Sequence, residues 1–334
     1  MTSLLSDTPL AIQPHTVLPI KVTVGIPTFH RPEQVARTVS TVLQQIEQLP
    51  SPGGGPTVDV LVVDNDPAGS AAAAIAGLGS PVVRYVVEAR PGISAARNRM
   101  LDECGRSDLL VCIDDDEYPH PGWLRALLDT YLVDRPAAVY GRVVAQFDGP
   151  LDPWIAAGHF FARFDAPDGA QLTAAATGNL LLDLHQLRSR GLRFDDRLGL
   201  SGGEDTMLTR ALAGQGGRIV RCAGSVVTHR IAVDRMTRRW VLQRSWSHGN
   251  THAVVDVLLA PDAGHRIRVR GKLLAAGVVR ALAGSARSGY GLLVRSQRHQ
   301  ARGLRTTFRG VGMVSAAVGF TFQEYARRSR KGWF

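Results

Sequence analysis

Three consecutive aspartates, Asp114–Asp116, follow directly on the apolar run Leu109–Ile113. That run predicts a buried strand, so the carboxylates stand where the strand emerges, and in an open α/β sheet this end borders the ligand crevice. Side chains alternate along an extended chain, so Asp114 and Asp116 can face the same side. Two converging carboxylates repel unless a cation lies between them, and oxygen ligands select a hard ion such as Mg²⁺ or Mn²⁺. The triplet therefore predicts a divalent-metal site, with a solvated acidic turn as the alternative.

Two further strand ends are expected at the same edge of the sheet. Asp64–Asp66 follows the apolar run Val58–Val63, and Pro27 and Thr28 end the β-branched run Lys21–Pro27. Taken alone, Asp64–Asp66 is ordinary turn chemistry before a proline. Because parallel strands end at one edge of a sheet, we expect these polar groups to face the same crevice as the aspartate triplet.

The segment Arg90–Asn98 is a candidate for anion binding. Gly92 permits an unusual turn, Ser94 can cap the helix that follows, and a helix N-terminus points free N–H groups outward. Arg90 and Arg97 add full positive charges. A diphosphate bound here would lie near a cation at the aspartate triplet. The alternative is a capped surface helix with solvated arginines.

Glu204 and Asp205 open another expected helix, directly after Gly202 and Gly203. A carboxylate at a helix start is very commonly a cap, and the functional alternative is a general base held at the rim of the crevice. His229 ends the last expected strand of the body. A lone histidine is usually structural, but one at a strand end near three carboxylates can complete a metal shell.

The elements that must position these residues alternate between strand and helix. Strands are expected at Lys21–Pro27, Val58–Val63, Val82–Val87 and Leu109–Ile113, with helices at Pro32–Gln48, Ala68–Ala76 and Ser94–Cys104 between them. This alternation predicts a parallel α/β sheet with right-handed crossovers. The pattern then predicts a helix at Pro121–Val133, a strand at Ala137–Gln146, an aromatic-rich binding loop at Phe147–Gln171, and strands at Arg218–Cys222 and Ser225–Arg230. From Thr237 onward the pattern is helical and rich in arginine.

The order of these motifs resembles that of a family 2 glycosyltransferase. The matching segments are IPTFHRP, VVDND, ARPGISAARN, DDD, GNLLL, GGED and VTHR, which run from about Lys21 to His248. The resemblance implies the GT-A fold of nucleotide-diphospho-sugar transferases, an α/β fold with a mostly parallel central sheet flanked by helices. We expect a flexible N-terminal segment at 1–18, the GT-A catalytic domain at 19–234, and a basic helical C-terminal extension at 235–334.

The resemblance also implies a role for each matching residue. Nucleotide contacts are expected from Pro27, Thr28, Asp64, Arg90, Arg97, Asp114 and Asp115. The donor sugar is expected against Gly178, Asn179 and Gly203. The triplet matches the family's DxD motif, which binds the ribose and a Mn²⁺ or Mg²⁺ ion, and the expected metal ligands are Asp114, Asp116 and His229. Asp205, with Glu204 beside it, matches the family's catalytic base.

The expected reaction follows from those roles. A nucleoside diphosphate is a poor leaving group until a cation neutralises its developing charge. Asp205 takes the proton from the attacking acceptor hydroxyl, and a single base with an external nucleophile implies inversion at the anomeric carbon. The helix after His229 lacks the Q-x-x-R-W motif of processive synthases, so single additions are expected. Three adjacent aspartates leave the metal register open by one position, with Asp116 preferred.

Charge is unevenly distributed along the chain. Its 334 residues carry a formal net charge of +10, yet residues 235–334 hold 19 Lys and Arg against 3 Asp and Glu, a local charge of +16. Short apolar stretches with dense arginine suit helices lying in a membrane interface that carries anionic headgroups. The alternative is a basic helical subdomain packed on the body. Nucleic acid is not expected as a partner, because the tail has no recognised binding module and few aromatics to stack bases.

Other features bound the class of protein. Cys104, Cys112 and Cys222 lie far apart, which excludes a disulfide scaffold and a cysteine-built zinc site. No uncharged apolar run approaches the roughly 18 residues of a spanning helix, and the N-terminus lacks the pattern of a secretory signal. We therefore expect a cytoplasmic protein, peripheral at the inner face of the cell membrane. Its partners would be a nucleotide-sugar donor and a sugar or lipid-linked saccharide acceptor; no feature specifies an oligomeric state.

Two rival functions share some of these features. A sugar-nucleotide nucleotidylyltransferase also combines an α/β sheet with aspartates and a metal, but it would need a Gly-rich, basic loop after the first strand, which GIPTFHRPEQ lacks. A non-catalytic nucleotide- or membrane-binding scaffold is the other. Donor hydrolysis with and without Mn²⁺ separates the three.

Overall fold

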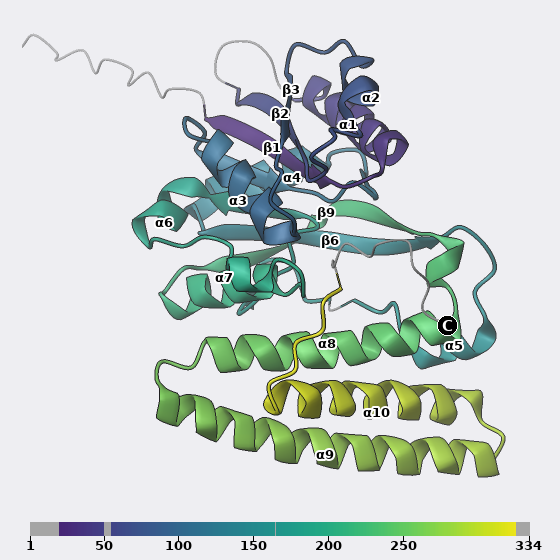
Figure 1. Cartoon of the computed structure of the whole chain (residues 1–334). Coiled ribbons are helices and arrows are strands. Elements are labelled where there is room, and N and C mark those ends of the chain that lie inside the picture. The colour runs from purple at the N-terminus through teal and green to yellow at the C-terminus, as the bar shows by residue number, and fades with distance from the viewer. Residues whose placement is uncertain (1–19, 50–54, 164, 325–334) are drawn as a thin grey trace, which may run out of the picture.

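The computed structural model describes residues 20–49, 55–163 and 165–324. Within that range, a sheet with helices on both faces forms the body, and three long helices form a layer beneath it (Figure 1). The expected flexible segment 1–18, most of the predicted loop between Pro50 and Pro56, and the basic pair Arg327-Arg328 lie outside the described residues.

One sheet runs through the body in the order β3-β2-β1-β4-β8-β6-β9-β5, with β7 paired to β9. The strands are β1 (Lys21–Thr28), β2 (Thr57–Asp64), β3 (Val83–Val87), β4 (Leu109–Cys112), β5 (Glu117–Pro119), β6 (Ala138–Phe147), β7 (Gln171–Leu172), β8 (Leu180–Asp183) and β9 (Ile219–Ile231). The predicted parallel half, β3-β2-β1-β4, is present, and β6 and β9 are also parallel. β8, β5 and β7 join antiparallel, which makes the sheet mixed.

Helices cover both faces of this sheet. α1 (Pro32–Glu47), α2 (Ala72–Ala76) and α4 (Trp123–Asp134) pack on one face, and α3 (Ile93–Glu103), α6 (Leu184–Ser189) and α7 (Glu204–Gly214) pack on the other. Because both faces are buried, β2 reads as a continuous apolar run rather than an alternating one. Within β2, the adjacent residues Val60 and Leu61 are both fully buried, yet they belong to hydrophobic cores on opposite faces of the sheet.

The second helix is shorter than predicted. α2 begins at Ala72 rather than Ala68, because Gly69 adopts a left-handed φ of 66° and interrupts the helical run. The Asp64 carboxylate accepts a hydrogen bond from Ala71 N at 2.8 Å, so the end of β2 fixes where the helix starts. The carboxylate at the end of β2 therefore has a local structural role.

Two other expectations in the second half of the body are corrected. The strands predicted at 218–222 and 225–230 are one strand, β9, whose register against β6 shifts between Tyr140 and Arg142. The partner in β9 moves from Arg221 to Val226 there, and extra residues of this kind bend a strand without ending it, although the sequence pattern resembles a break. The predicted loop Phe147–Gln171 contains a short helix, α5 (Pro153–Gly158), capped by Asp152.

The helical prediction from Thr237 onward is confirmed by α8 (Arg238–Leu258), α9 (Ala263–Leu293) and α10 (Gln297–Ala317). α10 packs against both α8 and α9 (Figure 1). Glycine makes the second contact very close: a Cβ added to Gly303 would lie 2.5 Å from Ser288 N and 2.7 Å from Gly284 O. In the described residues, no helix combines the length and apolarity needed to cross a bilayer.

Candidate active site

The ends of β1 and β4 meet at one edge of the sheet. Thr28 Oγ1 donates a hydrogen bond to Asp115 Oδ2 at 2.8 Å. Thr28 also pairs in register with Asp64 at the end of β2. The three parallel strands thus bring their polar ends together, and Pro27 lies buried beside them.

Asp115 is the buried member of the aspartate triplet, at 6% exposure. Besides the bond from Thr28, it accepts one from Arg31 Nη1 at 2.8 Å. Burial raises the pKa of Asp115 to about 6, and the charge of Arg31 opposes that rise. Arg31 was missed by the sequence analysis, although it lies within the first motif, IPTFHRP.

Asp116 lies among cations. Its Oδ2 is 3.0 Å from Arg31 Nη1, 3.3 Å from Arg235 Nη1 and 3.7 Å from His229 Nε2. Arg235, just beyond the expected end of the catalytic domain, was also not anticipated. Asp116 is therefore the carboxylate of the triplet that lies nearest to a nitrogen able to bind a metal.

His229 presents an open ring nitrogen to Asp116. Its Nε2 is buried and has no hydrogen-bond partner among the described residues. Burial lowers the pKa of His229, which favours the neutral imidazole that metals bind. Within the described part of the chain, no group of three or more His, Cys, Asp and Glu side chains is arranged to hold a metal. The donor set here is one carboxylate and one imidazole, which fits Mn²⁺ or Mg²⁺ only if a ligand supplies further oxygens.

Arg163 holds the other nitrogen of His229. Arg163 Nη2 donates to His229 Nδ1 at 2.5 Å, and a guanidinium can only donate. In the neutral imidazole the proton then stays on Nε2, which points toward Asp116. Coordination by Nε2 needs the other tautomer, so Arg163 must release Nδ1 before His229 can bind a metal.

Arg97 joins Asp114, expected as a metal ligand, to Glu204, expected at the catalytic position. It is 6% exposed, donates to Asp114 Oδ1 at 3.1 Å and forms a close ion pair with Glu204. Glu204 is itself 2% exposed, and burial raises its pKa to about 7 against the opposing charge of Arg97. Asp114 therefore pairs with Arg97 in this structure, apart from Asp116 and His229, although all three were expected as metal ligands.

Asp205 differs from its neighbour Glu204. It is half-buried, and its carboxylate accepts a local hydrogen bond from Thr206 N at 2.5 Å. Its neighbour Glu204 pairs with Arg97, which also pairs with Asp114, so the start of α7 lies beside the aspartate triplet. Of the two carboxylates that open α7, Glu204 forms the buried ion pair with Arg97, and Asp205 does not take part in it.

Gly203 fixes the position of that helix start. It has a left-handed φ of 91°, and a Cβ there would lie 2.3 Å from Thr251 Cγ2 on α8. Gly178 is under a similar constraint, because a Cβ would lie 2.5 Å from Glu117 Oε1. Gly178 thus lies against Glu117, and Gly203 lies against α8, directly before the carboxylates that open α7.

Glu117 is a buried carboxyl that the sequence analysis overlooked. It is 1% exposed and accepts a hydrogen bond from Asp114 N at 3.2 Å. Burial raises its pKa well above the ordinary value, and the charge of Asp114 adds to the rise. Its position directly after the triplet was the available signal.

Three residues expected to touch the donor are placed otherwise. Asp64 has no exposed surface, and its carboxylate accepts bonds from Ala71 N, Asp66 N and Tyr85 Oη. Asn179 is also fully buried, and its amide bonds the side chain of Trp123 and the backbone of β6 and β9. Arg90 is exposed and pairs with Glu88 at 3.1 Å.

The segment Arg90–Asn98, the candidate for anion binding, is stabilised by Asn65 rather than by the expected cap residue Ser94. Asn65 donates to Glu88 O at 2.9 Å and to Arg90 O at 2.6 Å, and accepts from Gly92 N. The predicted cap by Ser94 is wrong: its hydroxyl donates to the Asp195 carbonyl instead. The first N–H of α3, that of Ile93, bonds Gly199 O at 2.9 Å, so it is not free for an anion.

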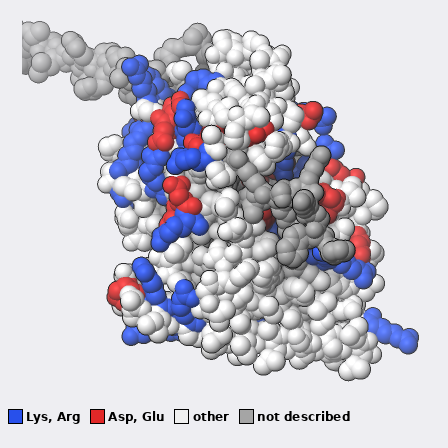
Figure 2. All heavy atoms as spheres, in the orientation of Figure 1, with Lys and Arg blue, Asp and Glu red and all other residues white. Residues whose placement is uncertain are grey.

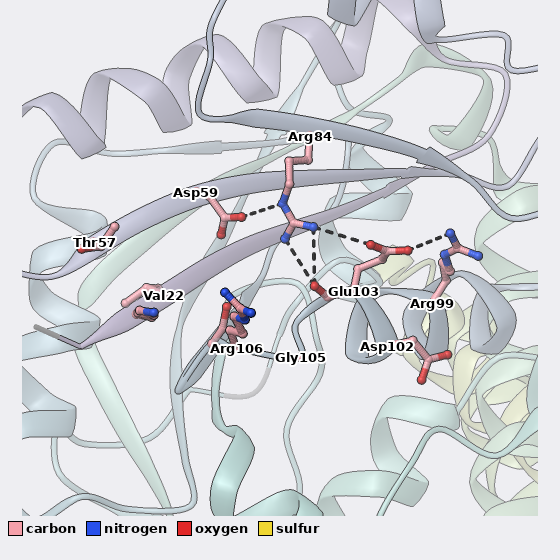
Figure 3. A pocket seen from close by; sticks show the side chains of 11 residues that line it. Val22, Thr57, Asp59, Arg84, Arg99, Asp102, Glu103, Gly105 and Arg106 are labelled. Atoms are coloured by element: carbon pink, nitrogen blue, oxygen red, sulfur yellow. Dashed lines mark hydrogen bonds and ion pairs between the residues drawn. The ribbon is translucent and has the colours of Figure 1, made fainter. Parts of the chain in front are cut away.

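A hollow of about 670 Å³ lies at the other end of the strands. Lys21 and Thr57, which begin β1 and β2, line it. Figure 3 shows Arg84 between Asp59 and Glu103, at 2.7 and 3.6 Å. Arg84 and Arg99 in this hollow are paired with acidic residues, and the hollow is separate from the edge where the carboxyl ends of the strands meet.

Comparisons with known proteins agree with this geometry. The family described as Glycosyl transferase family 2 matches residues 23–183. The chain is 30% identical over 262 residues to the succinoglycan biosynthesis protein ExoM of Rhizobium meliloti (strain 1021), a match that covers 77% of this chain and 81% of that protein.

Solved structures show the same fold at low identity. Residues 1–349 of S. aureus TarS match with a TM-score of 0.52 at 12% identity, over 87% of this chain and 91% of that one. GalNAc-T7, solved with UDP, GalNAc and Mn²⁺, matches with a TM-score of 0.51 at 14% identity, over 77% of this chain but only 55% of its own.

The fold is therefore GT-A, as the motif order implied, and the nucleotidylyltransferase alternative is set aside. Through Arg97, the aspartate triplet and the start of α7 lie together at the edge of the sheet where β1 and β4 end. The chain belongs to glycosyltransferase family 2 and is a transferase enzyme.

Proposed function

We propose that this enzyme transfers one sugar, with inversion, from a nucleotide-diphosphate sugar to an acceptor hydroxyl in a metal-dependent reaction. The observation that carries the proposal is the open, buried Nε2 of His229 at 3.7 Å from Asp116, at the strand-end edge of the sheet. Within the described residues this nitrogen has no hydrogen-bond partner, and beside a carboxylate it suits a cation brought by a diphosphate.

Asp116 and His229 are the residues that would hold Mn²⁺ or Mg²⁺, which supplies positive charge to a departing diphosphate. Arg31, Arg163 and Arg235 surround the same carboxylate or imidazole and can donate to phosphate oxygens. When Arg163 turns from His229 to a phosphate, it also frees Nδ1 for the tautomer that binds metal. Donor binding and metal binding would then support each other.

Asp205 is proposed as the base. It is half-buried, stands at the start of α7 and is held there by Gly203. It takes the proton from the acceptor hydroxyl as that oxygen attacks the anomeric carbon. Glu204, paired with Arg97, is proposed as a positioning residue rather than a second base. One base and an external nucleophile give inversion.

The donor side is proposed to run from Pro27, Thr28 and Asp115 for the nucleoside to Gly178 and Gly203 for the sugar. Arg97 connects these donor-side residues to the start of α7, where the proposed base lies, because it pairs with both Asp114 and Glu204. Asp64 and Asn179 act through neighbours, because their side chains are buried and engaged.

The acceptor is proposed to be a polysaccharide precursor, carried on a lipid at the cytoplasmic face of the membrane. A relative at 30% identity is named for succinoglycan biosynthesis, which supports the polysaccharide class. Single additions fit a chain whose α8 lacks the Q-x-x-R-W sequence.

The outer side of α9 supports membrane attachment. Ile267, Leu282 and Leu293 are 72%, 67% and 85% exposed, and helical spacing puts Leu274 and Val278 on the same side. At 31 residues the helix is about 46 Å long. Figure 2 shows the surface over α9 as mostly uncharged, with basic groups toward its ends. Apolar residues between basic ends suit a helix that lies in an anionic bilayer surface.

The activity is tested by measuring release of nucleoside diphosphate from a panel of nucleotide sugars, with Mn²⁺, Mg²⁺ or EDTA. Transfer to a saccharide acceptor should need a divalent ion, and NMR of the product should show the opposite anomeric configuration to that of the donor. Retention of configuration, or full activity in EDTA, would contradict the mechanism.

Membrane attachment is tested by sedimentation with vesicles. The chain should sediment with phosphatidylglycerol vesicles, be released by high salt, and not bind phosphatidylcholine. Leu282→Asp should weaken binding, whereas Val133→Asp, at an 82% exposed valine on α4, should not. Salt-insensitive binding would sink the idea, as would self-association through α9 in sedimentation velocity.

A further inference from the structure

Glu117 closes the turn that carries the aspartate triplet. Its backbone N–H donates to Asp114 O at 3.1 Å, and its carboxylate accepts a hydrogen bond from Asp114 N at 3.2 Å. The two ends of the turn are therefore joined twice, once by the backbone and once by the side chain. Glu117 is 1% exposed, so its carboxylate is withdrawn from any ligand and acts through the residues that it contacts.

The same turn is bonded to the strand that carries His229. Glu117 is the first residue of β5 and pairs in register with His229 on the antiparallel strand β9. The next residue along β9, Arg230, donates its N–H to Asp116 O at 3.1 Å. Residues directly opposite in an antiparallel pair have their Cβ atoms about 4.5–5.5 Å apart, with the side chains on one face. The ladder therefore sets the spacing between Asp116 and His229, the proposed metal ligands.

α1 holds the backbone of this turn independently of the Glu117 side chain. Thr38 is fully buried, and its hydroxyl donates to Asp115 O at 2.9 Å and to Glu117 O at 3.1 Å. We expect these bonds, and the ladder with β9, to persist when only the side chain at position 117 is changed. The carboxylate can therefore be removed without removing the turn from the fold.

The Glu117 carboxylate lies against Gly178, which is proposed to line the donor sugar. A Cβ added to Gly178 would lie 2.5 Å from Glu117 Oε1 and 2.9 Å from Oε2. The φ of Gly178 is not in the left-handed region, so glycine is required here for space rather than for backbone conformation. The carboxylate thus occupies the volume that a side chain at position 178 would need.

Gly178 is a fixed contact, because the next residue holds its position. Asn179 is fully buried and has a φ of 141°, a value that L side chains rarely adopt. Its side-chain amide accepts from Trp123 Nε1 at 2.8 Å and donates to backbone carbonyls of β6 and β9. A backbone conformation of this kind persists only where the surrounding contacts determine it. The Glu117 carboxylate therefore joins a rigid turn on the donor side to the turn of the triplet.

We infer that Glu117 is a positioning residue that holds the pair of proposed metal ligands, Asp116 and His229, at a fixed place relative to the donor-sugar side. The inference rests on the proposed function for the roles of that pair and of Gly178. A diphosphate and the sugar attached to it must be bound at the same time, so the distance between the two parts of the site matters for the reaction. Glu117 fixes that distance from inside the protein, without contact with the donor.

Hydrogen exchange measured by mass spectrometry tests this positioning without donor, metal or activity. Glu117→Ala removes the acceptor of Asp114 N, so peptides that contain Asp114–Glu117 should exchange about fivefold faster, as expected for the loss of one ordinary hydrogen bond. Equal exchange of these peptides in the wild type and Glu117→Ala overturns the inference.

Asp183→Asn is the matched control for exchange. It changes another buried carboxyl, at the opposite end of β4, where Asp183 pairs in register with Leu109. Exchange of the peptides that contain Asp114–Glu117 should stay at the wild-type rate in this variant. An increase as large as that in Glu117→Ala would show a general loosening of the sheet and would also overturn the inference.

Metal affinity and kinetics show whether the position matters for the reaction. With the nucleoside diphosphate that the activity assay releases, Glu117→Ala should bind Mn²⁺ about tenfold more weakly, a usual cost of changing a residue that orients a metal ligand. The kcat should fall by a similar factor, while the KM of the acceptor stays unchanged. Glu117→Gln keeps an acceptor oxygen for Asp114 N and should restore most of both. Wild-type Mn²⁺ affinity in a Glu117→Ala chain that only melts at a lower temperature would make the role purely structural and refute the inference.

Gly178→Ala tests the contact from its other side. The three atoms nearest to the added Cβ all belong to Glu117, so this substitution should displace the carboxylate and weaken Mn²⁺ binding by a similar factor. In the Glu117→Ala background the carboxylate is gone, and the same substitution should cost little. Additive effects of the two substitutions on Mn²⁺ affinity would contradict the inference. Absence of any transfer, with faster exchange in Glu117→Ala as expected, would instead count against the proposed function alone.

Discussion

Arg97 and Arg309 are both withdrawn from solvent, and their surroundings are opposite. Arg97 lies between Asp114 and Glu204, two carboxylates of the same chain. Arg309 is influenced by Arg280 and has a buried Nε without a partner in the described part of the chain. The first guanidinium completes a network inside the protein, and the second leaves one incomplete.

The difference separates residues that position from residues that bind. A buried charge whose partners are built in holds its neighbours in place and offers little to a ligand. A buried polar atom without a partner among the described residues, such as Arg309 Nε or His229 Nε2, is costly unless a ligand satisfies it. The same criterion distinguishes Asp205 from Glu204.

The largest effect is expected at the base. Asp205→Asn should lower kcat by about 10³-fold, because the acceptor hydroxyl loses its proton acceptor. Donor affinity, measured by calorimetry, should hardly change, since the residues proposed to bind the nucleoside lie at the ends of β1 and β4. Loss of donor binding in this variant would argue against the assignment, and would place Asp205 with the positioning residues.

The metal pair gives the next effect. Asp116→Asn should weaken Mn²⁺ binding in the presence of nucleoside diphosphate by about 100-fold, at least as much as an outer-shell change costs in metal sites. Asp114→Asn, which alters a carboxylate paired with Arg97, should weaken it far less. Electron paramagnetic resonance of free Mn²⁺ measures both; the reverse order would move the metal to Asp114.

The buried Glu204 predicts a pH dependence of stability. Its pKa is raised from 4.5 to about 7, so the folded state resists its ionisation, and stability is lost as pH rises through that interval. The shift corresponds to about 3 kcal/mol in the free energy of unfolding above pH 7. Glu204→Gln should remove this loss, and urea unfolding at several pH values measures it. Glu33→Gln, at an exposed site, should follow the wild type; a pH-independent difference for Glu204→Gln would refute the prediction.

Helix packing beneath the body gives the smallest effect, with opposite signs at two glycines. Gly303→Ala forces a Cβ to within 2.5 Å of Ser288 N and should lower the free energy of unfolding by about 1–3 kcal/mol. Gly289→Ala meets nothing within 4 Å and should raise it by roughly 0.5–1 kcal/mol through helix propensity. Thermal unfolding compares the pair, and equal shifts would contradict the close contact of α9 and α10.

The sheet and its crevice could be predicted because their signals are local. Apolar runs such as Val58–Val63 mark strands buried on both faces, and strands of like direction must end at one edge. The meeting of Thr28 with Asp115, 87 residues apart, follows from that rule alone. The bulge in β9 was hidden because a strand that bends and a strand that ends look the same in sequence.

The partners of the side chains at this edge of the sheet could not be predicted from the sequence and were found only in the structure. Arg97 and Glu204 are separated by 107 residues, and no spacing rule predicts their ion pair. Asp64 and Asn65 are adjacent, yet their side chains have different roles. The Asp64 carboxylate accepts a hydrogen bond from Ala71 N, whereas the Asn65 amide donates to Arg90 O in the loop before α3. Arg163 comes from an aromatic loop whose path no periodicity specifies. Burial and partner count, both tertiary properties, decide these cases.

The contact of Gly203 with Thr251 has a practical consequence for anyone who would shorten this chain. The start of α7 packs against α8, so the three-helix layer supports the position of Asp205, the proposed base. We expect a chain that ends at Arg235 to keep the motifs from IPTFHRP to VTHR and to lose this support.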